Sequence, residues 1–283
     1  MITISSLARS AQPPPPRSGV VRIASIDVEW TKNYRIKNGN RPFCYSVVWL
    51  DLPADGPADL ADGVPFAYTS VYVDDPGEQD QLVATAADTF RTATEHADLI
   101  TGHQLCADLG VLANTAPAPS PHLDRARGHW KNRAAADAEK AYLDTRYDAG
   151  HLLNGASRRL VDVCTELGLD VTQPELRRVT MPAWHRRWID EGLTEGRERV
   201  SVLNLRHSLS TAYVAARAAD LARWPSSGLN VNRALADGAR GAFAWLDHPT
   251  FSDLLEDPCP SETAGLSPSK APRPRARPRS STR

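Results

Sequence analysis

The sequence lacks several features that would assign it to a class at once. Its four cysteines lie far apart and form no Cys-x-x-Cys pair. We therefore expect reduced thiols in a cytoplasmic protein, without a disulfide framework or a structural zinc site. No apolar stretch approaches the roughly 18 residues that cross a bilayer, and the N-terminus has no continuous apolar segment of the kind found in secretory signals. We expect neither export nor a membrane partner.

Two common classes of catalytic motif are also missing from the sequence. It contains no glycine-rich loop of the kind that cradles phosphates, and no nucleophile elbow of the kind that carries a catalytic serine. The chemistry must therefore be sought in other residue types.

The net charge of −1 hides an uneven distribution. The last 20 residues carry six cations and no acid, and the first 19 carry Arg9 and Arg17. Without these two ends, residues 20–263 have a charge of about −9. The net charge of this segment does not attract nucleic acid. Any attraction for phosphates must therefore come from local patches, the tails or bound cations.

The composition divides the chain into four segments. Residues 1–19 contain a PPPP run and are rich in serine, and residues 258–283 have the same character with a basic bias. We expect both to be disordered. The basic tail is either a weak, salt-sensitive nucleic-acid contact or a solubilising segment. Between the tails we expect one folded domain over residues 20–224 and a helical extension over residues 225–257.

Hydrophobic periodicity predicts an α/β fold for the segment between the tails. The expected strands cover residues 20–30, 43–52, 65–75, 97–103 and 141–148, and the expected helices cover residues 78–97, 106–116, 122–141, 156–171, 199–224 and 228–257. Three strands in succession, followed by alternating helices and strands, predict a mixed sheet. Its first three strands should be antiparallel, the later ones parallel, and helices should flank it.

Two acids stand side by side on the first of these strands. Asp27 and Glu29 are two residues apart, so their side chains point to the same face. Removing two neighbouring carboxylates from water costs several kcal/mol each unless a positive charge lies between them. Mg²⁺ and Mn²⁺ favour oxygen ligands, so this pair suits them better than zinc. The alternative is a strand end at which both acids meet solvent.

A third acid, Asp108, follows the short strand over residues 97–103. The segment Gly102–Leu109 reads GHQLCADL, and it should open a helix with Asp108 on the first turn, facing back toward the strand end. A negative charge there also interacts favourably with the helix dipole. Taken alone, Asp108 could be simply an acid at a helix N-terminus.

Together these segments resemble the motifs of the DEDD (DnaQ-like) 3′–5′ exonuclease superfamily. Residues 21–30 resemble its first motif, D-x-E on the first strand, and residues 102–108 resemble its second, G-H-N-x-x-x-D, with Gln104 where the family usually has Asn. Residues 141–171 are similar to the segment between the later motifs. The resemblance covers residues 20–224 and implies a ribonuclease-H-like fold.

The resemblance also implies an activity and a set of site residues. The activity would be hydrolysis of terminal phosphodiester bonds at single-stranded DNA or RNA 3′ ends by two Mg²⁺ or Mn²⁺ ions about 3.5–4 Å apart. The residues implied as catalytic metal ligands are Asp27, Glu29, Asp108 and His207, and those expected as substrate contacts are Trp30, Lys32, His103, Gln104 and Arg35. Of these, His103 either supports the turn of the second motif or touches the substrate. The identity of any protein partner stays open.

The third motif of the family is incomplete in this chain. In one alignment His207 takes the place of the final acidic ligand and Val202 that of the general base; in the other, His207 is the base and Ala212 replaces the acid. Imidazole binds Mn²⁺ through a neutral nitrogen but suits Mg²⁺ poorly. Three interpretations remain open: an active, Mn²⁺-preferring exonuclease, a degenerate domain that binds nucleic acid or a protein without cleavage, and a ribonuclease-H-fold endonuclease. The endonuclease would share the acid on the first strand but not the turn over residues 102–108.

Two further segments combine basic and aromatic residues. Residues 31–41, TKNYRIKNGNR, follow the first acidic motif and either position phosphates or form a solvated loop. Residues 181–188 carry Trp184 and Trp188 among basic residues, a mixture that can stack on single strands. The spacing of these two tryptophans favours the packing face of a helix.

Overall fold

Two long antiparallel strands form the centre of the fold. The computed structural model describes residues 1–7, 13, 15, 18–32, 35–155, 157–177 and 179–255. Strand β2 (Val20–Thr31) pairs with β3 (Arg41–Pro53) along almost its full length, with Ile26 opposite Val47. Strand β3 is buried at nearly every position, and β2 is buried through its middle, over residues 22–26 and 28–29. Helices cover both faces of the sheet, so apolar side chains of these strands are buried on either face.

The six strands of the main sheet follow the order β1-β5-β3-β2-β6-β7. The remaining strands are β1 (Ile2–Ser5), β5 (Phe66–Tyr72), β6 (Leu99–Gly102) and β7 (Ala141–Asp144). Strand β3 runs antiparallel to both β2 and β5, whereas β6 runs parallel to β2 and β7 runs parallel to β6. This mixed sheet flanked by helices is a ribonuclease-H-like arrangement, and the predicted fold class is confirmed.

The first residues of the chain form an edge strand. Residues 2–5 pair antiparallel with β5, and the Ser5 hydroxyl contacts Thr69 Oγ1 at 2.8 Å. The prediction of disorder over residues 1–19 is therefore wrong for residues 2–5. The open edge of β5 offers backbone groups that need partners, and the β-branched ITIS segment satisfies them. The expected C-terminal tail, residues 258–283, lies outside the described residues.

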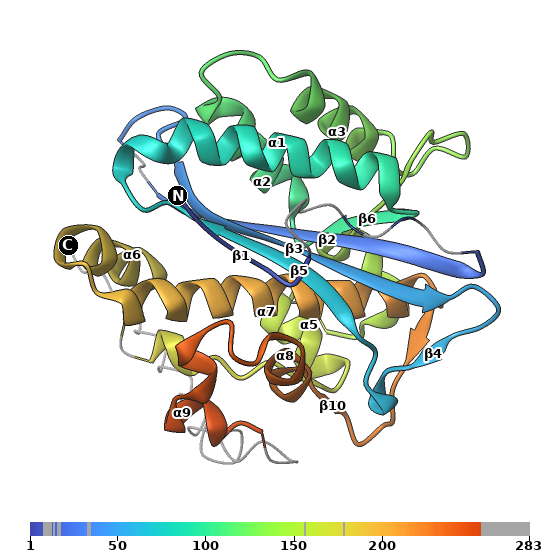
Figure 1. Cartoon of the computed structure of the whole chain (residues 1–283). Helices are drawn as coiled ribbons and strands as arrows, with labels where there is room; N and C mark the ends of the chain where they lie inside the picture. Colours follow the sequence, from blue (N-terminus) through green and yellow to red (C-terminus); the bar gives the residue numbers. More distant parts are fainter. Residues whose placement is uncertain are drawn as a thin grey trace, which may run out of the picture.

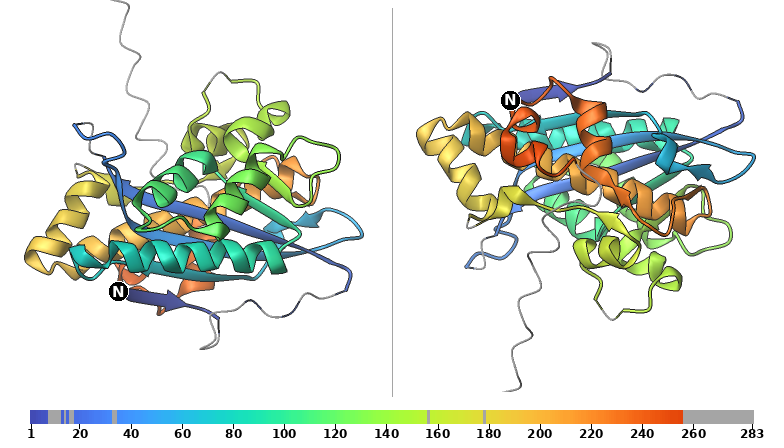
Figure 2. Two further views of the ribbon diagram at one scale, coloured as in Figure 1. Left: turned by 90° about the horizontal axis from the view of Figure 1, so that it is seen from above. Right: turned by 90° about the horizontal axis from the view of Figure 1, so that it is seen from below.

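Helices form a layer on each face of the sheet (Figure 1). One face is covered by α1 (Gln79–His96), α2 (Leu105–Thr115) and α3 (Pro121–Lys131), and the other by α7 (Thr194–Ala218) with α5 (Leu160–Glu166) and α8 (Val231–Ala239). Figure 2 shows the first group from above and the C-terminal elements from below. Two apolar clusters lie against the sheet: one is formed mainly with α5, α7 and α8, and the other mainly with α1 and α2, together with Trp184 and Val200.

Shorter elements connect these layers. They are α4 (Thr145–Asp148), α6 (Met181–Glu191), α9 (Pro249–Ser252) and two small parallel pairs, β4 (Ala58–Asp59) with β9 (Ala222–Arg223) and β8 (Leu169–Asp170) with β10 (Leu229–Asn230). Helix α3 ends ten residues before the expected boundary at residue 141, and α7 begins at Thr194 instead of residue 199. None of the described helices combines the length and apolar character that a membrane crossing requires.

A buried ion pair joins α7 to the segments on either side of it. The Arg206 guanidinium donates to both carboxylate oxygens of Glu175, at 2.8 and 2.7 Å, and both side chains are almost fully buried. Arg206 also donates to Asn232 of α8, and the Trp245 indole donates to Glu175. This network fixes the helix that carries His207 relative to the C-terminal segment.

Candidate functional site

Asp27 and Glu29 point from the central strand toward α7. Their cross-strand neighbours on β3 are Ser46 and Cys44. Ser46 bonds to Ser208 of α7 at 2.7 Å, and the Cys44 thiol contacts Asn204 of the same helix. The two carboxylates therefore lie between the sheet and α7, and they are not at a solvated strand end.

Helix α7 brings two polar side chains to the carboxylate pair. His207 Nδ1 lies 3.2 Å from Glu29 Oε1 and 3.5 Å from Asp27 Oδ2. Asn204, one helical turn earlier on the same face, donates its side-chain amide to Asp27 Oδ2 at 2.7 Å. One potential ligand atom each from Asp27, Glu29 and His207 lies within 4.8 Å of the other two. This trio could hold a cation.

Asp108 is the buried acid of the second motif. It lies on the first turn of α2, as the sequence predicts, and is 2% exposed. Its Oδ2 has no hydrogen-bond partner among the described residues. Desolvation raises its pKa well above the usual range, and the charges of Asp27 and Glu29 add to the rise. An acid held there without a partner is unfavourable unless a cation or a proton compensates it.

The carboxylate pair and the imidazole shift each other's pKa. Desolvation raises the pKa of Glu29 to about 7, against the opposing hydrogen bond from His207. Desolvation lowers the pKa of His207, but its hydrogen bonds and charge interactions with Asp27 and Glu29 outweigh this, and its pKa rises to about 10. Without a cation, the imidazolium is thus the counter-ion of the pair.

Gln173 contacts the far side of the His207 ring. Its side-chain nitrogen lies 3.0 Å from Nε2 of His207. A neutral ring accepts from this amide and keeps its proton on Nδ1, toward Glu29. An imidazolium donates from both nitrogens and requires the amide oxygen on this side instead. Gln173 can satisfy either state by rotating its amide.

The turn before α2 is tied to the end of β7. His103 Nδ1 lies 2.9 Å from the Thr145 hydroxyl and Nε2 lies 3.0 Å from the Arg158 carbonyl oxygen. Burial lowers the pKa of His103 to about 4, so the ring is neutral near pH 7. Both ring nitrogens are engaged by the protein, which makes His103 a support for the turn.

Gln104 adopts a left-handed backbone conformation in this turn, with φ 65°. Its N–H donates to Asp144 Oδ1 at 2.8 Å, and the fully buried Asp144 also accepts from the Trp130 indole. The Gln104 side chain lines the candidate site. Asp144 thus holds a strained residue at the site, a role that the sequence alone did not reveal.

A cavity of about 700 Å³ opens over the carboxylates. Its polar lining comprises Asp27, Glu29, Lys32, His103, Gln104, Asp108, Thr180 and His207, and its apolar lining comprises Val28, Trp30, Leu160, Leu176, Val179, Met181 and Pro182. Eight of the nine residues expected at the site therefore line one cavity. The exception is Arg35, which is exposed on the loop after β2.

Several other predicted features lie away from the cavity. Trp184 is buried and its indole donates to the Glu175 carbonyl, while the Trp188 indole donates to the Val73 carbonyl. The preferred interpretation of these tryptophans as a packing face is confirmed. Val202 and Ala212 are fully buried in the apolar core, so neither position offers a base or an acid.

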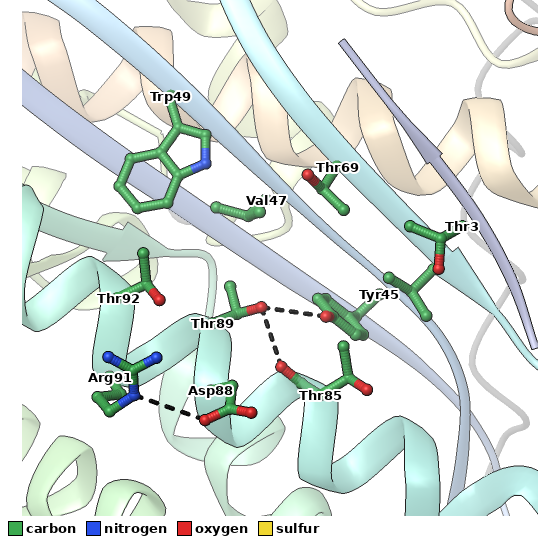
Figure 3. A pocket seen from close by; sticks show the side chains of 11 residues that line it. Thr3, Tyr45, Val47, Trp49, Thr69, Thr85, Asp88, Thr89, Arg91 and Thr92 are labelled. Atoms are coloured by element: carbon green, nitrogen blue, oxygen red, sulfur yellow. Dashed lines mark hydrogen bonds and ion pairs between the residues drawn. The ribbon is translucent and has the colours of Figure 1, made fainter. Parts of the chain in front are cut away.

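A second cavity, of about 260 Å³, lies between α1 and the opposite face of the sheet (Figure 3). Tyr45, Val47 and Trp49 of β3 line one side. The acid in its lining, Asp88, lies 3.5 Å from Arg91 in an ion pair. This cavity has no cluster of acids, so the cavity over Asp27 is the better candidate for metal chemistry.

Comparison with known proteins adds no relative. No model of a protein family matches the chain, and no curated protein matches it either.

Proposed function

We propose that the chain is a metal-dependent 3′–5′ exonuclease that hydrolyses terminal phosphodiester bonds of DNA or RNA. The observation that carries the proposal is the buried Asp108 carboxylate, which has an oxygen without a partner in the described structure and lines one cavity with Asp27, Glu29 and His207. Three acids and an imidazole around one cavity are a suitable donor set for divalent cations.

The donor set fits Mg²⁺ or Mn²⁺, of which the proposal requires two. Bound there, the cations would supply Lewis-acid charge and an activated water. Asp27 is held by Asn204 through Oδ2. His207 can contribute only after it has lost the proton on Nδ1, because a metal ligand must offer a free lone pair. This requirement favours Mn²⁺, which accepts imidazole more readily than Mg²⁺ does.

The remaining cavity residues suit the substrate. Trp30 offers an aromatic surface for the terminal nucleotide, Lys32 a charge for a phosphate, and Gln104 an amide for a polar group. His103 is less suited to contact substrate, because both its ring nitrogens are engaged. A cytoplasmic location belongs to the same proposal, since Cys44, Cys106 and Cys164 are free thiols.

A second function is favoured by one specific contact. His207 already neutralises Asp27 and Glu29 as an ion-pair partner, and Val202, the aligned general-base position, is an apolar core residue. A domain with these properties could bind nucleic acid or a protein partner without cleaving.

The decisive experiment incubates the purified chain with 3′-labelled single-stranded DNA and RNA, in Mg²⁺ and separately in Mn²⁺. Asp27→Ala tests the site, and Asp88→Ala, at an exposed acid of α1, is the matched control. Loss of label that persists in Asp88→Ala and disappears in Asp27→Ala supports the nuclease. Intact label under both metals would favour the non-cleaving domain.

A further inference from the structure

The loop between β2 and β3 differs in charge from the rest of the body. Residues 32–41 carry four cations, Lys32, Arg35, Lys37 and Arg41, and no acid. Residues 20–263 as a whole have a charge of about −9. A phosphate chain that approaches this body is therefore repelled by most of it and attracted locally by this loop.

The structure fixes this loop close to the candidate site. It begins three residues after Glu29, and Lys32 lines the cavity over the carboxylates. The Thr115 hydroxyl, at the end of the helix that carries Asp108, donates to the Asn40 carbonyl. The loop projects at the end of the molecule where α6 lies (Figures 1 and 2).

Internal hydrogen bonds shape the turn. The Gly39 N–H donates to the Ile36 carbonyl at 2.9 Å, with Asn38 in a left-handed conformation between them. The Arg41 guanidinium folds back onto the carbonyls of Asn38 and Asn40. These bonds organise the turn over residues 36–39, and we call the exposed residues 35–37 at its start the loop tip.

The loop tip combines an apolar side chain with two cations. Ile36 is 60% exposed, the highest value among the large apolar side chains of the described residues that face solvent. Arg35 and Lys37 on either side are exposed as well. Aliphatic side chains between cations can pack against bases while the cations contact phosphates.

We propose that the loop tip binds the strand upstream of the terminal nucleotide, so that the substrate is a polynucleotide and not a dinucleotide. This inference rests on the proposed function, because it assumes that the strand ends at the carboxylates. Lys37 is eight residues from Glu29, a distance of at most about 29 Å along extended chain. The tip can therefore reach phosphates several nucleotides upstream of the end.

The test measures binding of the full chain to fluorescein-labelled oligothymidylates of roughly 3 and 12 nucleotides. Fluorescence anisotropy in EDTA, across roughly 50 to 200 mM NaCl, gives the dissociation constant and its salt dependence without hydrolysis. The variants are Arg35→Gln/Lys37→Gln and, separately, Ile36→Ser. Arg223→Gln/Arg240→Gln removes the same charge from exposed positions on β9 and after α8 and is the matched control.

Each phosphate contact to a single strand contributes about 0.7 to the slope of log affinity against log salt. Arg35→Gln/Lys37→Gln should therefore reduce the slope for the longer strand by about 1.4. Ile36→Ser should weaken binding of the longer strand and leave the slope unchanged, because an apolar contact releases no counter-ions. The short strand and the control variant should show little change.

An unchanged slope in Arg35→Gln/Lys37→Gln, or an equal reduction in the control, would overturn the inference. The inference would also be overturned if Arg35→Gln/Lys37→Gln weakened binding to vesicles containing phosphatidylserine but not binding to the oligothymidylates. That result would assign the loop to an anionic lipid surface. Hydrolysis in Mn²⁺ separates the two proposals. If the loop variants cleave like the unaltered chain and bind the longer strand equally well, only the loop inference is wrong. If binding depends on the loop but no cleavage occurs, the proposed nuclease activity is wrong and the loop contact stands.

Discussion

The side-chain amide of Asn204 donates to both the carboxylate and the backbone oxygen of Asp27, at 2.7 and 3.2 Å, across 177 positions of sequence. This contact joins helix α7 to the central strand at the candidate site. It orients one oxygen of Asp27, and His207, three residues further on, completes the cluster with Glu29. The acids are held in place by protein contacts, so their response to substitution can be predicted.

Replacing Asp108 with Asn should stabilise the metal-free protein. The substitution keeps the shape but removes a buried acid whose Oδ2 has no hydrogen-bond partner among the described residues and whose charge is raised in energy by Asp27 and Glu29. We expect the free energy of unfolding to rise by about 1 to 3 kcal/mol, and the shift in melting temperature caused by Mn²⁺ to disappear. Thermal denaturation with and without Mn²⁺ measures both; an undiminished Mn²⁺ shift would exclude Asp108 from the cation site.

Replacing His207 with Asp should change the cation preference. The variant supplies a fourth carboxylate and removes the imidazolium that neutralises Asp27 and Glu29. Metal-free protein should lose stability, and Mg²⁺ should bind roughly tenfold or more tightly. Calorimetric titration with Mg²⁺ measures the change, and His207→Gln, which removes the imidazole without adding an acid, is the control. Equal Mg²⁺ affinity in both variants would contradict the expectation.

Replacing Gln104 with Gly should relieve backbone strain. Gln104 has a φ of 65°, a conformation that costs a non-glycine residue roughly 1 kcal/mol. We expect the variant to unfold at higher urea concentration, with a gain of about 0.5 to 1 kcal/mol. Gln104→Ala loses the same side chain but keeps the strained Cβ, so it should show no gain. If both variants gained the same stability, the gain would come from loss of the Gln104 side chain and not from relief of backbone strain.

Removing only one partner of the buried ion pair between Arg206 and Glu175 should strongly destabilise the fold. Arg206→Met leaves the Glu175 carboxylate, which is 1% exposed, without its cation, and should lower the free energy of unfolding by roughly 3 to 5 kcal/mol. Adding Glu175→Gln should recover part of this loss, because the amide still accepts from Trp245. Arg91→Met, at a partly exposed ion pair, should cost less than about 1 kcal/mol. Urea denaturation compares the four proteins.

His185 should make stability fall in mild acid. Burial lowers the pKa of His185 to about 4, against a smaller opposing effect of Asp190, while the unfolded value is about 6.5. The unfolded state therefore binds the proton first, and stability is lost as the pH falls from about 6.5 toward 4. The neutral ring stacks on Phe43 at 4.1 Å and contacts the Tyr72 hydroxyl.

Melting temperatures between these two pH values test this assignment. His185→Gln removes the titrating group, so its melting temperature should decline less steeply with acid than that of the unaltered chain. His151→Gln, at an exposed histidine, should follow the unaltered chain. Parallel declines in all three proteins would assign the acid sensitivity to other groups.

The sequence by itself determined the features that depend on local periodicity. Alternation along residues 20–31 places Asp27 and Glu29 on one face, and the change from strand to helix after Gly102 places Asp108 on a first helical turn. The order of strands and helices was enough to predict the mixed sheet. The sequence did not predict β1, because the proline run at residues 13–16 indicated disorder for the whole N-terminal segment, including the four residues that pair with β5.

The tertiary structure alone decided which distant residues complete the site. Asn204, Gln173 and Asp144 are ordinary polar residues in their own segments, and only the helical spacing of Asn204 and His207 gave a signal. A hydrogen-bond partner dozens of positions away leaves no mark on local periodicity, because the choice of partner depends on how the layers pack. The packing of α7 against β2 determines whether His207 meets the carboxylates, and no pattern within either segment contains that information.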